Sequence, residues 1–150
     1  MRRVGLRMFN VYGPGQSPKS PYCGVVRLFA EKIATGAEAV IRGDGGQARD
    51  FVYVSDAARA IGLALDLSLD GAHVVNVCTG RPVTIMDVVT QLEAAAGKPL
   101  RRRYEPETDM SVAMSVGDPA LAKALLGFTT EVSFDEGVVR MMHALSGPSA

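Results

Sequence analysis

Several features that would assign a chain to a particular class are missing from this 150-residue sequence. It has no unbroken apolar stretch long enough to span a bilayer and no cleavable signal with an apolar core, so we expect a cytoplasmic protein. Its sixteen basic residues balance its sixteen acidic ones, which argues against nucleic acid or an anionic membrane as a partner. Any anion binding must therefore be local.

Metal and redox chemistry also lack their usual residues. Cys23 and Cys78 lie far apart without C-x-x-C spacing, a pattern typical of buried free thiols rather than of a disulfide. His73 and His143 have no carboxylate or thiol partners at ligand spacing, so we expect no metal site. The one basic run, residues 101–103, is more typical of a solvated strand edge than of a nucleic-acid patch.

The remaining sequence predicts one α/β domain over residues 1–150, because its length suits one core and no linker or repeat interrupts it. Apolar periodicity and turn residues predict strands at 4–9, 39–41, 51–54 and 74–77. Helices are predicted at 24–35, from Ser55 or Asp56 to about 67, at 85–96, from 118–119 to 127, and from Ser133 onward. Asp56 is expected to cap its helix, and Thr84 with Asp87 to form a capping box.

The stretch GDGGQARDFVYVSD, residues 43–56, is the most informative segment. A turn with three glycines leaves backbone N–H groups free to approach a ligand, and Arg49 can offer a planar fork to phosphate oxygens. These features fit an anion clamp. The alternative is an ordinary β-turn followed by a surface arginine.

A second segment, LRMFNVYGPGQSP at residues 6–18, reads as a strand that ends at Asn10 and enters a Gly/Pro loop. Ligands of open α/β sheets bind beyond the carboxyl ends of the strands, where the Asn10 amide could meet a substrate. A turn-capping asparagine explains the same residue equally well.

Together these segments resemble the C-terminal half of the NAD-dependent epimerase/dehydratase family, the extended short-chain dehydrogenase/reductases that act on nucleotide sugars. The resemblance extends from residue 1 to about 144 and rests on LRMFNVYGPGQSP, PYCGVVRLFAEKIATG, VIRGDGGQARDFVYVSDAARAI, NVCTGRPVTIMDVV, DPALAKALLGF and VSFDEGVVRMM. It implies an α/β fold of mixed short strands and helices, the C-terminal portion of an extended short-chain dehydrogenase/reductase fold, without the N-terminal Rossmann half.

The resemblance also implies roles for substrate-binding residues. Arg49 matches the arginine that contacts the nucleotide diphosphate, and Asn10 matches the asparagine near the substrate phosphates. Gly24 and Val25 match backbone that lines the nucleotide. Arg42 occupies a position where the family often places a flat group against the base, and a guanidinium plane could stack there.

The motifs that carry the family's chemistry are missing from this chain. There is no glycine-rich dinucleotide loop, and no tyrosine has a lysine four positions later. NAD is implied by the family, but Met8 and Phe9 match only the rim of its site, so we expect NAD not to bind this chain alone. Without a hydride acceptor or a proton acceptor, we expect no catalytic residues and no turnover by this chain alone.

A departure from the family pattern lies at residues 106–112. The family usually has a second phosphate-binding arginine here, and Thr108 takes its place. Losing one charge-assisted contact would cost about 1.5–3 kcal/mol of diphosphate affinity. One of the arginines at 101–103 could substitute by reaching across.

Three functions fit the sequence. The first is the substrate-binding part of an NAD-dependent sugar-nucleotide epimerase, similar to UDP-glucose 4-epimerases, which works with a missing or separate Rossmann half. FNVY at residues 9–12 favours an epimerase over a 4,6-dehydratase. The others are a stand-alone nucleotide-sugar binding module and an inactive structural remnant. The strand at 4–9 lacks the neighbours it has in the family, so we expect self-association or strand exchange.

Overall fold

The computed structural model describes residues 2–66, 68, 70–107 and 112–146. Their helices are α1 (Val25–Thr35), α2 (Val54–Asp66), α3 (Ile85–Ala96), α4 (Ala120–Leu126) and α5 (Phe134–Ser146). Their strands are β1 (Arg2–Met8), β2 (Asn10–Tyr12), β3 (Ala39–Arg42), β4 (Ala48–Arg49), β5 (Phe51–Tyr53), β6 (Gly71–Val77), β7 (Val83–Thr84), β8 (Arg102–Glu105) and β9 (Met114–Ser115). This mixture of short strands and helices confirms the predicted fold class.

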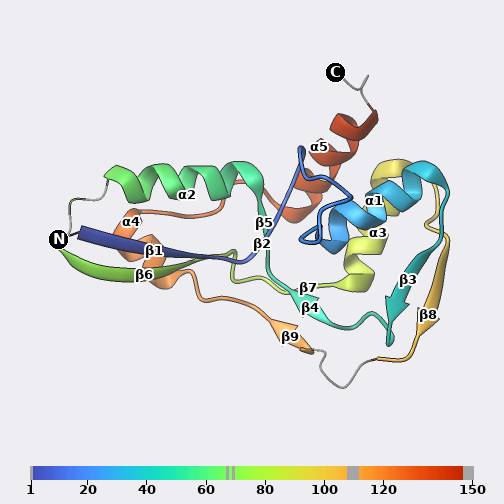
Figure 1. Ribbon diagram of the computed structural model, residues 1–150, viewed down its shortest axis with the longest axis horizontal. Helices are drawn as coiled ribbons and strands as arrows, with labels where there is room; N and C mark the ends of the chain where they lie inside the picture. The colour runs from blue at the N-terminus through green and yellow to red at the C-terminus, as the bar shows by residue number, and fades with distance from the viewer. Residues whose placement is uncertain (1, 67, 69, 108–111, 147–150) are drawn as a thin grey trace.

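The strands pair mainly in parallel. β1 pairs with β6, β2 with β5, and β3 with β8, all in parallel. β4 lies between β7, which is antiparallel to it, and β9, which is parallel. Figure 1 shows β1, β6, α2 and α4 in one half of the molecule, while α1, α3, β3 and β8 lie in the other. β2 and β5 run between the two halves.

Two hydrophobic cores form on either side of β5. Phe51 and Tyr53 belong to the core that α1, α3 and α5 surround, while Val52 belongs to the core between α2, α4 and β6. Successive side chains of a strand point to opposite faces, so this short strand contributes to both cores. In the first core Tyr12 donates a hydrogen bond to the carbonyl of Phe134. Burial raises the pKa of the Tyr12 phenol, so it remains a donor at neutral pH.

Local signals located most helices correctly. α1 ends at Gly36 and α4 at Gly127, both in the left-handed conformation that the sequence predicts. The predicted capping box of α3 is present between Thr84 and Asp87.

Two local expectations about where elements end were wrong. Val54 is the first residue of α2 rather than the end of a strand. The segment after Phe9 continues as β2, because Asn10, Val11 and Tyr12 pair with β5. Pairing with a distant strand is invisible to local sequence patterns.

Asp56 does not cap its own helix in the expected way. Its carboxylate is buried and accepts hydrogen bonds from the backbone N–H groups of Glu131 and Val132, and from Arg59. It therefore joins the start of α2 to the segment that precedes α5.

Among the described helices, none combines the length and the apolar character needed to cross a membrane.

Candidate functional site: a pocket with two arginines

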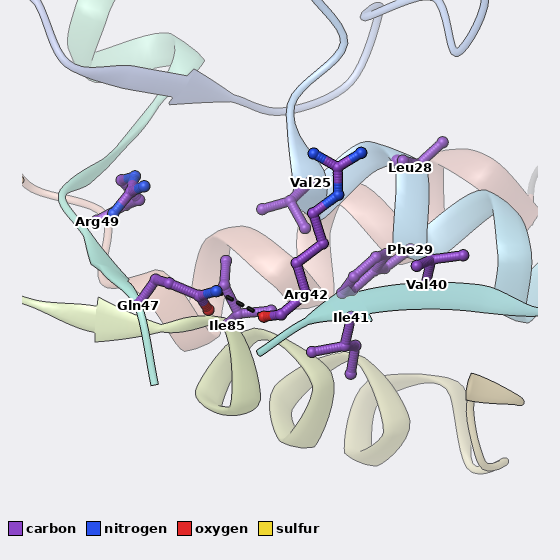
Figure 2. Close-up of a pocket in the computed structure, with 9 residues that line it drawn as sticks. All are labelled: Val25, Leu28, Phe29, Val40, Ile41, Arg42, Gln47, Arg49 and Ile85. Carbon is purple, nitrogen blue, oxygen red and sulfur yellow. Dashed lines mark hydrogen bonds between the residues drawn. The ribbon is translucent and has the colours of Figure 1, made fainter. Parts of the chain in front are cut away.

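A pocket of about 390 Å³ lies between the start of α1, the end of β3 and the start of β4. Figure 2 shows its nine lining residues. Six are apolar, and the polar ones are Arg42, Gln47 and Arg49. None of these nine described residues is acidic. The pocket therefore joins an apolar wall to two cations, which suits a flat ring that carries an anionic group.

Arg49 ends β4 and is partly fixed by backbone. Its Nη1 donates to the carbonyls of Ala48 (2.8 Å) and Val112 (2.7 Å). Its Nε and Nη2 make no hydrogen bond with the described residues, so one edge of the guanidinium remains available to a ligand. The two carbonyl contacts limit the rotamers of the side chain beside the pocket.

Arg42 ends β3, and its side chain is exposed. In Figure 2 it extends from β3 toward Val25 and Leu28 at the start of α1, while Arg49 lies at the other side of the pocket. Its guanidinium forms no ion pair or hydrogen bond within the described part of the chain. The carbonyl of Arg42 accepts a hydrogen bond of 2.6 Å from Nε2 of Gln47, which fixes the backbone from which the side chain projects.

The structure brings some of the sequence-predicted residues together. Val25, Arg42 and Arg49 line the same pocket. Gly24 is the N-cap of α1 and makes no side-chain cap, so the first N–H groups of α1 lack a side-chain partner beside the pocket.

Asn10 is not among the residues that line this pocket. It is exposed, and its Nδ2 donates to the carbonyl of Asp50 at 2.9 Å, next to Arg49 in the chain. Met8 ends β1 and is 38% exposed, while Phe9 is half-buried and donates its backbone N–H to Val77. Met8, Phe9 and Asn10 lie where β1 ends and β2 begins, and none of them lines the pocket that contains Arg42.

The glycine turn does not offer all the free amides that its sequence suggests. Gly43 donates its N–H to the carbonyl of Glu105, and Gly46 donates to Oδ1 of Asp44. A side chain at Gly45 would collide with Met86 of α3, so the glycine allows close packing inside the protein. The turn therefore positions Arg42 and Arg49, and its amides at Gly43 and Gly46 are not available to an anion.

The arginines at 101–103 do not reach the pocket. Arg101 donates to the carbonyl of Gly36, Arg102 pairs with Glu93, and Arg103 pairs with Glu38 and Glu105. The expectation that one of them replaces the missing phosphate-binding arginine is therefore wrong. Thr108, the residue in that position, lies outside the described residues.

The turn after β6 does not offer free backbone N–H groups to a dinucleotide. A pyrophosphate needs free N–H groups where a parallel strand turns into a helix. After β6, the N–H groups of Thr79 and Gly80 do converge, but both donate at 2.8 Å to the carboxylate of Asp50, which is fully buried. Thr79 Oγ1 and the Gly117 N–H complete this arrangement. An internal carboxylate thus takes the place of an external anion.

Cys78 lies beside this buried carboxylate. Burial, followed by the charge of Asp50, raises the pKa of the Cys78 thiol to about 11. The thiol is therefore protonated and unreactive at neutral pH, as expected for a buried free cysteine.

Sequence reasoning missed most of the pocket wall. Leu28, Phe29 and Ile41 carry the periodic apolar signal of core elements, which does not distinguish a core from a wall. Gln47 is the one missed residue with a usable signal, because it is a polar residue between the glycine turn and Arg49.

Comparisons with known proteins show which proteins this chain is similar to. Residues 1–78 match the family model described as NAD dependent epimerase/dehydratase family. The chain is 33% identical to the UDP-glucuronate 4-epimerase of Thermodesulfobacterium geofontis, over 92% of this chain and 41% of that protein.

Two solved structures are also similar. The UDP-glucose 4-epimerase of Thermotoga maritima with UDP-glucose has a TM-score of 0.87 and 36% identity, covering 95% of this chain and 45% of that one. The Thermus thermophilus UDP-glucose 4-epimerase in complex with NAD has a TM-score of 0.86 and 34% identity. The match covers 97% of this chain and 47% of that one. The chain therefore spans less than half the length of the proteins it matches.

Proposed function

Because the chain belongs to the NAD dependent epimerase/dehydratase family, we propose that it is the nucleotide-sugar-binding part of an NAD-dependent epimerase of the UDP-sugar 4-epimerase type. The observation that carries this proposal is the pocket with an apolar wall, two arginines and no acidic lining residue. A nucleoside diphosphate has the matching chemistry, a flat base and a diphosphate.

Each pocket residue has a part in this proposal. Arg49 offers its unpaired guanidinium edge to the diphosphate, as a charge-assisted and geometrically directed contact. Arg42 covers one face of the base with its guanidinium plane, and Val25 lies beside it in the pocket wall. Asn10, whose amide donates to the carbonyl of Asp50 next to Arg49, would contact the substrate near its phosphates.

Catalysis requires groups that this chain lacks. It has no Tyr-x-x-x-Lys pair to accept a proton from a sugar hydroxyl and no glycine-rich dinucleotide motif, and the N–H groups of Thr79 and Gly80 after β6 are already bonded to Asp50. We infer that a Rossmann half, missing or separate, supplies both. The second edge of β1 has no partner among the described strands, and parallel strands are normally enclosed on both sides, which supports docking at this edge.

Titration calorimetry of the purified chain with UDP and UDP-glucose tests the proposal. We expect both to bind, and Arg49→Ala to weaken binding about ten- to a hundredfold, since one charge-assisted hydrogen bond contributes about 1.5–3 kcal/mol. We also expect no conversion of UDP-glucose when NAD is added to this chain alone.

Arg103→Ala is the matched control, because this arginine is exposed and pairs with Glu38 and Glu105 away from the pocket. Thermal melting should verify that the Arg49 variant is folded, since Arg49 also contacts Val112. Absence of nucleotide binding at millimolar concentration would contradict the proposal and favour an inactive remnant.

A further inference from the structure

Arg81 is a cation that the pocket with Arg42 and Arg49 does not include. It is exposed, and its guanidinium forms no hydrogen bond or ion pair with the described residues. It belongs to the turn that follows β6, at the carboxyl end of a parallel strand, where ligands of α/β sheets bind. This end of β6 is distinct from the open edge of β1, where we place the Rossmann half. An unpaired arginine here is therefore a candidate ligand-binding residue.

The backbone that carries Arg81 is held on both sides. The N–H groups of Thr79 and Gly80 donate to the carboxylate of Asp50. The N–H of Arg81 donates to Oγ1 of Thr79 at 3.0 Å. Pro82 follows, and its ring fixes the backbone φ and removes the next N–H group. The turn therefore presents the Arg81 side chain from a defined position, although its own amides are occupied.

Two contacts bring the backbone of Arg81 near that of Arg49. Gly80, which precedes Arg81, donates at 2.8 Å to Oδ2 of Asp50, which follows Arg49. β4 and β7 also pair antiparallel, with Arg49 opposite Val83. Arg81 comes two residues before Val83, and alternate residues of an extended segment share one face. Arg81 therefore lies on the same face of this strand pair as Arg49.

Arg81 lines a second pocket, of about 230 Å³. Phe51 and Val83 line it too, and these residues are the neighbours of Arg49 along its own strand and across the ladder. The second pocket therefore adjoins the first at Arg49. Asp135 also lines the second pocket, but it forms no ion pair with Arg81 in the described structure. The guanidinium thus remains available to an anion.

We propose that Arg81 is the second phosphate-binding arginine of this chain, and that it selects a nucleoside diphosphate over a monophosphate. This inference rests on the proposed function. With the base in the first pocket and the first phosphate at Arg49, the next phosphate lies toward Arg81, and each phosphate receives its own charge-assisted contact. Arg81 thus supplies the charge that Thr108 lacks and that the arginines at 101–103 do not bring to the pocket.

Titration calorimetry of the full chain with UMP and UDP tests this assignment. The wild-type chain should bind UDP at least about tenfold more tightly than UMP, which is the effect of one charge-assisted contact. Arg81→Gln should remove most of this preference, because it weakens UDP binding and leaves the affinity for UMP unchanged. Arg49→Gln, in contrast, should weaken the binding of both nucleotides. Since the Arg81 side chain is exposed, Arg81→Gln should keep the wild-type melting temperature.

Arg101→Gln is the matched control, because it removes the same charge from an exposed arginine that donates to the carbonyl of Gly36 and lines neither pocket. It should leave both affinities unchanged. Asp135→Asn removes a negative charge from the pocket of Arg81. It should strengthen UDP binding without changing UMP binding, because a like charge near the second phosphate is lost.

Three outcomes would count against the assignment. An unchanged ratio of UDP to UMP affinity in Arg81→Gln would overturn this inference and leave the proposed function standing. A variant that loses affinity for UDP-glucose but keeps its affinity for UDP would also overturn it, since Arg81 would then contact the sugar. If the wild-type chain bound neither UMP nor UDP at millimolar concentration, the proposed function itself would fail, and this inference with it.

Discussion

Single residues in this protein hold loops together through buried charge. Asp50 joins three distant segments, because its carboxylate accepts hydrogen bonds from Thr79, Gly80 and Gly117. It directly follows Arg49, so the position of the pocket arginine depends on it. A buried carboxylate is stable only while its oxygen atoms are satisfied in this way.

We predict that Asp50→Asn lowers the free energy of unfolding by about 3 kcal/mol, because the amide loses the charge and turns an N–H group toward donors. Urea denaturation followed by circular dichroism measures this change. The control is Asp44→Asn, since Asp44 is exposed and an amide oxygen can still accept from Gly46. An equal, small effect of both substitutions would show that the Asp50 charge is unimportant.

Among the helices, α3 has the most complete start. Thr84 accepts from the N–H of Asp87, while the Asp87 carboxylate accepts from the N–H and hydroxyl of Thr84. These hydrogen bonds, first from the hydroxyl and then from the backbone, lower the pKa of Asp87. Ile85 at the start of α3 lines the candidate pocket, so this cap also fixes part of the site.

We predict that Thr84→Ala lowers the free energy of unfolding by about 1 kcal/mol at pH 7, whereas Thr84→Ser has little effect. A lowered pKa in the folded state means that the Asp87 contribution is fully present above the ordinary pKa of aspartate, about 4, and is lost as pH falls through the folded value.

Urea denaturation at pH 7 and at pH 2.5 should therefore give a smaller Thr84→Ala effect at the lower pH. Thr90→Ala is the control, because Thr90 lies within the same helix and donates to the carbonyl of Met86 without a carboxylate. If both variants had the same pH dependence, the ionised Asp87 would not be the cause.

Over the whole molecule, the two cores share β5. Leu92 is buried in the first core and Leu126 in the second, while Phe51 and Val52 are adjacent in one strand and contact different cores. Because β5 contributes side chains to both cores, unfolding of one core should disturb the other. We therefore expect the described chain to unfold in one cooperative transition.

We predict that Leu92→Ala and Leu126→Ala each lower the free energy of unfolding by about 2–5 kcal/mol. Tyrosine fluorescence and circular dichroism should give the same transition. Tyr12 and Tyr53 lie in the first core, so Leu126→Ala in the second core should still shift the fluorescence-detected midpoint. Leu121→Ala, on the exposed side of the same helix as Leu126, should change stability by less than about 0.5 kcal/mol.

The sequence by itself determined the family, the α/β class and most helix ends. Helix ends depend on signals that lie within a few residues of each other, as Gly36, Gly127 and the Thr84–Asp87 pair show. It also directed attention to Arg42 and Arg49 as pocket residues. Both flank one glycine turn, so their proximity is local.

Tertiary structure alone decided which side chains have partners. Asp56 could not be assigned to the segment before α5, because the backbone N–H groups that donate to its carboxylate lie 75 and 76 residues away. Arg102 and Arg103 looked available until β8 placed them beside Glu93, Glu38 and Glu105. The exposure of Ile61 and Leu65 on α2 could not be predicted for the same reason, since an apolar residue is exposed only when no distant segment covers it. Such contacts are set by packing between remote parts of the chain, about which local sequence patterns carry no information.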